Sequence, residues 1–129
     1  MKRWVPELSG AAYARIAALG GFRKPRPDSE NVALRHPSFR AYADYMETLE
    51  FATGLDELLA RAAVAPTAIM CSETLWWRCH RRLISDAAVL LRHVDVRHLM
   101  HDGSLQTHLI TSGARVTAHG LIRYDVLES

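Results

Sequence analysis

The stretch "TAIMCSETLWWRCHRRLISDAAVLLRHVDVRHLM" (residues 67–100) decides the predicted fold. Residues 67–71 form a short apolar run of the kind that makes a buried parallel strand. Residues 79–93 place apolar side chains at helical spacing, and residues 94–100 alternate as a second strand does. Because a strand, a helix and a strand follow one another, we expect two parallel strands joined by a right-handed crossover. The sequence therefore predicts an α/β fold with a short, mainly parallel sheet flanked by helices.

Upstream of that stretch, the sequence predicts one strand, one loop and two helices. The strand covers roughly residues 12–17, and a long, basic, proline-broken loop follows at residues 22–37. Ser38 is a good N-cap for the first helix, which we expect to end at Gly54, before a second helical segment at residues 55–65.

Downstream, the tail predicts a small C-terminal hairpin. The strand-like runs "RVT" (115–117) and "LIRYD" (121–125) lie on either side of His119-Gly120.

The composition predicts one globular domain, residues 1–129, with the cytoplasm as its location. The 129 residues are 49% hydrophobic and 23% charged. No apolar run approaches the ~20 residues of a membrane span, so we expect no membrane partner. The opening segment, residues 1–10, carries cations without the apolar stretch of a secretory signal, and two cysteines do not make a disulfide framework. A net charge of +2 argues against a broad nucleic-acid surface, although contact with a nucleic-acid end stays open.

The candidate site lies where the predicted strand at residues 67–71 leads into the helix. That strand would bring Cys71 to the carboxyl edge of the sheet, and Cys79-His80-Arg81 would open the helix. Ligands of open α/β sheets bind at this edge, where backbone N–H groups and the helix dipole attract anions. We therefore expect an anionic small molecule, such as a nucleotide or phosphate ester, to bind here. The residues expected to hold it are Arg78, Cys79, Arg81 and His98, with Arg23, Lys24 and Arg26 of the basic loop.

Two other interpretations of these residues stay open, and a third is disfavoured. In an enzyme, Cys71 would be a nucleophile or redox thiol stabilised as thiolate by the arginines, with Glu73 or His80 as its base. In a structural interpretation, the cysteines are small buried residues and Glu73 pairs with Arg78 or Arg81. A metal site is disfavoured, because the spacing C-x7-C-H lacks the paired ligands of zinc sites. We therefore predict no metal, and the sequence identifies no cofactor.

The motifs resemble those of the family known as domain of unknown function 488. Its signature, C-[AS]-E-x5-C-H-R, matches residues 71–73 and 79–81, and a later strand ends in the His-hydrophobic step of residues 96–99. Upstream, "ALGGFRKPRPDS" (18–29) is similar to the family's LGG-plus-basic loop, and "FRAYADYMETLEF" (39–51) is similar to its next helix. The string of Cys, Glu and Cys-His-Arg is the most specific part of the match.

The resemblance implies a compact α/β domain and assigns no activity. Family members usually begin with a strand and helix that carry a Gly-His-Ser/Thr step, followed by a D-x-R motif, and this sequence matches neither. We therefore expect a chain that is short at its N-terminus relative to the family. A sheet that lacks a strand leaves an open edge, which a homodimer could cover. A non-catalytic dimerisation or protein-interaction module is accordingly a further hypothesis.

Overall fold

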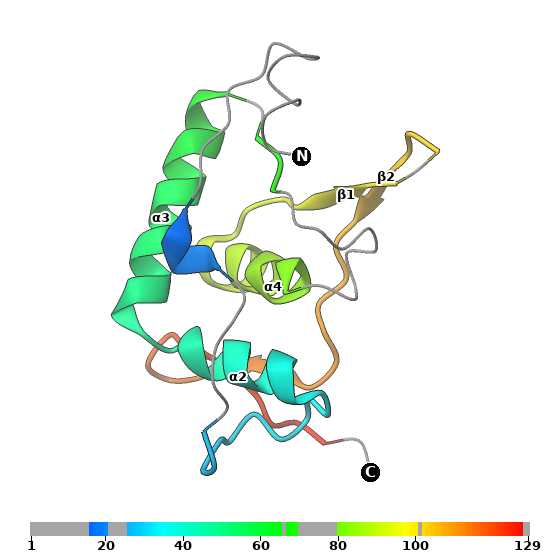
Figure 1. The fold of residues 1–129 in the computed structure, drawn as a ribbon. Coiled ribbons are helices and arrows are strands. Elements are labelled where there is room, and N and C mark those ends of the chain that lie inside the picture. Colours follow the sequence, from blue (N-terminus) through cyan, green and yellow to red (C-terminus); the bar gives the residue numbers. More distant parts are fainter. Residues whose placement is uncertain (1–15, 21–25, 66, 70–79, 101, 128–129) are drawn as a thin grey trace.

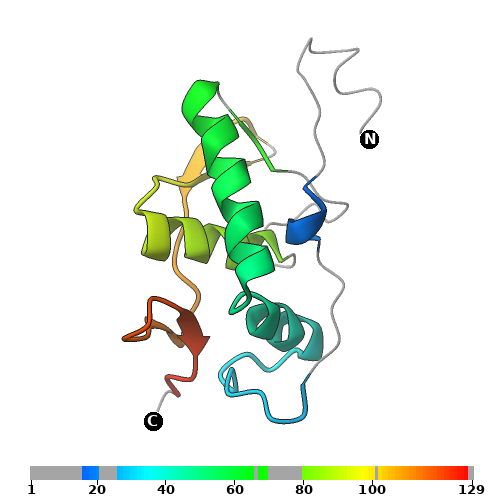
Figure 2. The same ribbon diagram turned by 90° about the vertical axis from the view of Figure 1, so that its left-hand side faces the viewer.

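The computed structural model describes residues 16–20, 26–65, 67–69, 80–100 and 102–127. The helical elements are η1 (Ala17–Leu19), α2 (Pro37–Tyr45), α3 (Leu49–Val64) and α4 (Arg81–Arg92). The strands are β1 (Arg97–Leu99), β2 (Leu105–Thr107), β3 (Ala114–Val116) and β4 (Ile122–Tyr124). In Figure 1, α3 stands along one side of the molecule, α4 lies near the centre and α2 lies below it. Figure 2 shows α3 crossing α4, with the β3–β4 hairpin at the opposite end from β1–β2.

The strands form two separate antiparallel hairpins, so the predicted mainly parallel sheet is wrong. β1 pairs with β2 in the register His98 opposite Gln106, and β3 pairs with β4. After β1 the chain reverses direction through Asp102-Gly103, where Gly103 has a φ of 85° that favours glycine. The hydrogen bonds of β1 therefore go to the strand that follows it, and the fold is α/β only in the loose sense of containing both helices and strands.

The predicted first strand of the parallel pair is not seen where the structure describes it. Residues 67–69 have no strand conformation, and Met70 and Cys71 lie outside the described residues. The strand expected at residues 12–17 also falls mostly outside them. Its described end leads into η1, a single 3₁₀ turn.

The two upstream helices meet at a different place from the one predicted. α2 begins at Pro37, one residue before Ser38, and α3 starts at Leu49 and runs straight through Gly54. Thr48 is the N-cap of α3, because its hydroxyl accepts a hydrogen bond from the backbone N–H of Phe51 at 3.2 Å. The break predicted at Gly54 was wrong because this glycine serves packing: an added Cβ would lie 2.8 Å from the side chain of Ala18.

Two sequence predictions are confirmed: the helix around residues 79–93 and the C-terminal hairpin. α4 buries Leu83, Ile84 and Ala87, which lie on its predicted apolar stripe. In the hairpin, β3 and β4 pair antiparallel around Gly120, whose φ is 76°. These elements were predictable because their signals are local to the chain.

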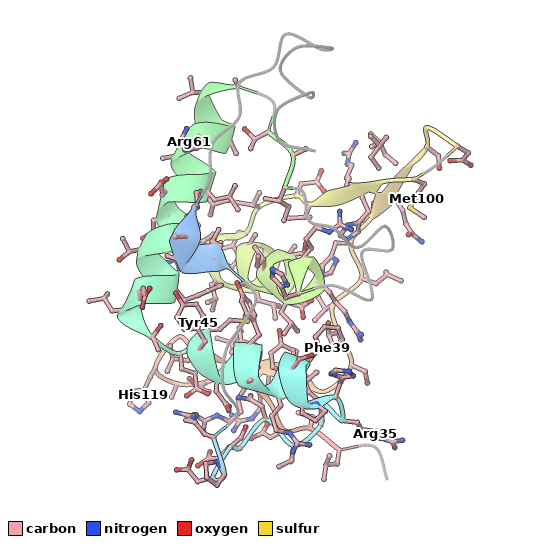
Figure 3. All side chains as sticks on the ribbon, in the orientation of Figure 1. Arg35, Phe39, Tyr45, Arg61, Met100 and His119 are labelled. Carbon is pink, nitrogen blue, oxygen red and sulfur yellow. The ribbon has the colours of Figure 1, made fainter. Side chains whose placement is uncertain are left out.

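The core lies where α2, α3, α4 and β4 meet. Its largest fully buried side chains include Tyr42, Phe51, Leu55, Leu83 and Tyr124. The Tyr42 hydroxyl donates a hydrogen bond to the Leu19 carbonyl at 2.9 Å, which ties α2 to η1. Figure 3 shows the neighbouring Tyr45 at the junction of α2 and α3, below η1, where its hydroxyl bonds the Ala18 carbonyl.

The close approach of α3 to η1 predicts the effect of filling Gly54. Gly54→Ala should lower the free energy of unfolding by about 1–2 kcal/mol, because displacing Ala18 outweighs the helix-propensity gain of about 1 kcal/mol. Urea titration of the purified chain measures this. The matched control is Thr53→Ala on the exposed face of α3, which should stabilise slightly. A Gly54→Ala chain as stable as the control would contradict the packing account.

Candidate functional site

The apolar face of α4 carries a buried carboxylate, Asp86. A buried carboxylate is costly unless hydrogen-bond donors surround it. Asp86 Oδ1 accepts from His108 Nε2 at 2.7 Å and from the backbone N–H of Thr111 at 3.1 Å. Its Oδ2 accepts from the hydroxyl of Tyr124 at 2.8 Å. The Asp86 side chain thereby joins α4 to the segment that follows β2 and to β4.

A second histidine extends this network outward. His98 Nε2 lies 2.7 Å from His108 Nδ1, so Asp86, His108 and His98 form a continuous hydrogen-bonded chain. The β1–β2 register explains the contact. His98 faces Gln106, and His108 is two residues further along on the same face, a diagonal cross-strand neighbour. We call Asp86, His108 and His98 the carboxylate–histidine chain.

The proton positions along this chain follow from its donors. Asp86 Oδ1 accepts from the Thr111 amide, which can only donate, and as an acceptor it pairs with His108 when the Nε2 of that ring carries the proton. His108 Nδ1 then carries a lone pair and accepts the Nε2 proton of His98.

The surroundings of His98 and His80 keep both imidazoles neutral at pH 7. Burial, followed by the charges of His108 and Arg81, lowers the pKa of His98 from 6.5 to about 4, and Asp86 offsets part of this effect. Burial and then the charge of Arg81 also lower the pKa of His80. Burial and the Asp86 carboxylate raise the pKa of Tyr124 well above its ordinary value, so its hydroxyl stays a donor.

The start of α4 gathers basic side chains. His80 is the N-cap residue, Arg81 and Arg82 follow, and the first turn contains no acidic residue. Arg82 Nε donates to the Thr111 hydroxyl at 2.9 Å, which connects the helix start to the loop that holds Asp86. The His80 ring lies 5.0 Å from the Tyr42 ring, so the N-cap residue packs on the core.

Of the residues predicted for the site, His80 and Arg81 are neighbours at the start of α4, and His98 lies on β1. The charge of Arg81 contributes to the lowered pKa of both histidines. Arg26 lies by α2, with its Nη2 3.4 Å from Asp44 Oδ1. The other predicted residues lie outside the described residues: Cys71, Glu73, Arg78, Cys79, Arg23 and Lys24. Their roles stay predictions.

Sequence reasoning missed Asp86, His108 and Tyr124. Asp86 had a readable signal, because it interrupts an apolar stripe between Leu83 and Ala87 and so needed buried partners. His108 had a weaker signal in the sequence, since His108 and His98 flank the Asp-Gly turn of a hairpin.

The described residues contain neither a metal cluster nor a membrane-spanning helix. No group of three or more His, Cys, Asp or Glu side chains among them is arranged to hold a metal ion. In the same part of the chain, no helix combines the length and the apolar character that crossing a membrane requires.

Fold and site together define a small domain of helices and hairpins built around a buried carboxylate–histidine chain. The protein belongs to the family described as Domain of unknown function DUF488, whose model matches residues 2–88. The resemblance inferred from the Cys-Ser-Glu and Cys-His-Arg motifs is thereby confirmed. The matched range includes Asp86, whereas His98, His108 and Tyr124 lie beyond it. Searches of curated proteins and of solved structures gave no match.

The lowered pKa of His98 predicts how stability depends on pH. The unfolded chain binds a proton at this residue near pH 6.5 and the folded chain only near pH 4, so His98 stabilises the fold fully above pH 6.5. On acidification this contribution, on the order of 1–2 kcal/mol, is lost between these two values. Urea titrations from pH 7 to pH 4 should show this loss in the parent.

The matched variants are His98→Gln and His119→Gln. In His98→Gln the free energy of unfolding should change less between pH 6.5 and pH 4 than in the parent. His119 is exposed at the β3–β4 hairpin, so His119→Gln should follow the parent. If the His98→Gln and parent profiles ran parallel, His98 would not be the group that titrates.

Proposed function

We propose that this protein binds an anionic ligand, such as a nucleotide, phosphate ester or nucleic-acid end, at the first turn of α4. One observation carries the proposal: α4 opens with His80-Arg81-Arg82 and has no acidic residue in its first turn. The dipole makes a helix N-terminus positive, so cations there are unfavourable and an anion is favourable. A bound anion would offset both the dipole and the two guanidinium charges.

The neighbouring histidines support the same proposal. Both His80 and His98 have lowered pKa values and are neutral at pH 7. Neutral imidazoles add no positive charge of their own, so the fixed charge for an anion would come from Arg81 and Arg82. Arg82, anchored to Thr111, would hold the helix start in place beneath the ligand.

A second proposal is a cysteine-dependent enzyme in which Cys71 is the nucleophile or redox thiol and His80 or Glu73 is its base. The lowered pKa of His80 favours it, because an imidazole in the neutral form can take a thiol proton. Cys71 and Glu73 lie outside the described residues, so this enzyme rests on the sequence motif.

A third proposal is a dimerisation or protein-interaction module. The observation in its favour is on the β1–β2 hairpin, where Leu99 and Leu105 face each other in the register and are 75% and 60% exposed. For all three proposals we expect the cytoplasm as the location, because a chain of this length with two cysteines lacks a disulfide framework.

Binding of phosphate tests the first proposal. Phosphate should raise the melting temperature of the parent, and Arg81→Ala should weaken phosphate binding by about tenfold or more because a charge-assisted hydrogen bond is lost. Thermal shift and calorimetric titration measure both effects. The control is Arg92→Ala at the other end of α4, which should leave the affinity unchanged. An Arg81→Ala chain protected as well as the parent would refute anion binding at this helix end.

A further inference from the structure

The outer face of the β1–β2 hairpin carries exposed leucines. Leu99 and Leu105 are opposite each other in the register, so their side chains lie on the same face of the hairpin. They are 75% and 60% exposed. Leu109 continues the alternation beyond β2, because the preceding His108 is buried and Leu109 is 68% exposed. We call Leu99, Leu105 and Leu109 the leucine stripe.

The two faces of the hairpin have different surroundings. On the inner face, His98 and His108 are buried and join the hairpin to Asp86 of α4. Figure 1 shows β1 and β2 at the edge of the molecule, projecting away from α3. A sheet of two strands with three residues each is short and needs a covered face for stability. The domain itself covers the inner face, and the leucine stripe on the outer face is available to another molecule.

Opposite charges lie at the two ends of the stripe. Arg97 precedes Leu99 by two residues, and its Nε and Nη2 donate to Asp95 Oδ2 at 3.1 Å and 2.9 Å. Its Nη1 is therefore available to a second acceptor. At the turn, Asp102 is exposed, and hydrogen bonds from the hydroxyl and the amide of Ser104 to its Oδ1 lower the pKa of the carboxyl. This carboxylate is ionised at pH 7, and its Oδ2 can accept from a donor on another molecule.

We propose that the leucine stripe is a homodimer interface in which two copies of the hairpin pack face to face and antiparallel. This interface rests on the proposed role as a dimerisation module and gives that role a surface. A two-fold axis across the strands, through the Leu99–Leu105 pair, places each of these leucines over the same residue of the second copy. Because this axis reverses the strand direction, Arg97 of each copy lies over the turn that carries Asp102 in the other. The outer face is thus complementary to itself in both shape and charge.

The size of the stripe predicts a weak dimer. A stable complex buries about 800 Å² on each partner, whereas exposed apolar patches of about 300–600 Å² are the largest that a typical monomer carries. Three leucines belong to the smaller class, and exposed ion pairs contribute little affinity. We therefore expect a dimer that forms and dissociates with concentration. The leucines would supply most of its affinity, and the charges would fix the antiparallel orientation.

Sedimentation velocity of the full-length chain at increasing concentration tests the interface, with reductant present to keep the cysteines as thiols. The parent should pass from monomer to dimer. Leu99→Lys should raise the dissociation constant by about tenfold or more, because two ammonium groups would meet at the apolar centre. The matched control is Leu49→Lys at the start of α3, across the molecule from the hairpin, where the leucine is 82% exposed. This variant should dimerise as the parent does.

The outcomes separate the interface from dimerisation itself. If the parent dimerises and Leu99→Lys dimerises equally well, the leucine stripe is refuted and dimerisation stands at another surface. A parent that stays monomeric at every concentration would overturn both the interface and the dimerisation module, and would leave the stripe to a protein of another sequence.

Mixing two charge variants tests the antiparallel orientation. Arg97→Glu and Asp102→Lys each bring like charges together in their own homodimer, so each alone should dimerise about threefold or more weakly than the parent. In an equimolar mixture, every mixed dimer regains two pairs of opposite charge: the two introduced groups meet each other, and the retained Arg97 meets the retained Asp102. The mixture should therefore dimerise more tightly than either variant. A mixture that is no more dimeric than its components would contradict the antiparallel orientation.

Discussion

The carboxylate of Asp86 is the constraint on which the rest of this structure depends. It is fully buried on α4, and its three donors come from segments that are distant in sequence: His108, Thr111 and Tyr124. Removing any one donor would leave a buried charge with less compensation, at a cost of about 1–3 kcal/mol. The position of both hairpins relative to α4 is therefore set by one side chain more than by strand pairing, since each hairpin has only two short strands.

Tyr124 extends this constraint to the other side of the core. Its hydroxyl donates to Asp86, and its backbone N–H donates to the Asn31 side chain at 2.8 Å. Asn31 in turn donates to Asp44 of α2 at 2.7 Å. A path of buried hydrogen bonds thus runs from α4 through β4 to α2. The apolar contacts of Tyr42 and Phe51 fill the space beside this path and supply the nonspecific part of the stability. The polar path fixes which elements are neighbours.

The sequence allowed prediction of the parts of the fold that depend on local signals. The apolar spacing of α4 and the Gly120 turn of the last hairpin gave the right elements. Strand pairing was beyond such signals, because an alternating run such as β1 is compatible with a parallel or an antiparallel neighbour. The Asp102-Gly103 turn would have favoured the antiparallel one. Of the site, the motif around His80 and Arg81 was found from the family resemblance. The contact of Asp86 with His108 could not be predicted from the sequence, since it spans 22 residues and exists only once α4 and the hairpin have packed.

Hydrogen exchange at the Thr111 amide tests the central role of Asp86 most directly. Thr111 lies in an irregular segment, where backbone amides ordinarily exchange fast, and its N–H is bonded to the buried Asp86 carboxylate. If the carboxylate organises the fold, this amide should exchange about as slowly as the Ala87 and Ala88 amides in the middle of α4. An exchange rate like that of the neighbouring, exposed Leu109 would contradict the account, because the hydrogen bond would then open without unfolding the core.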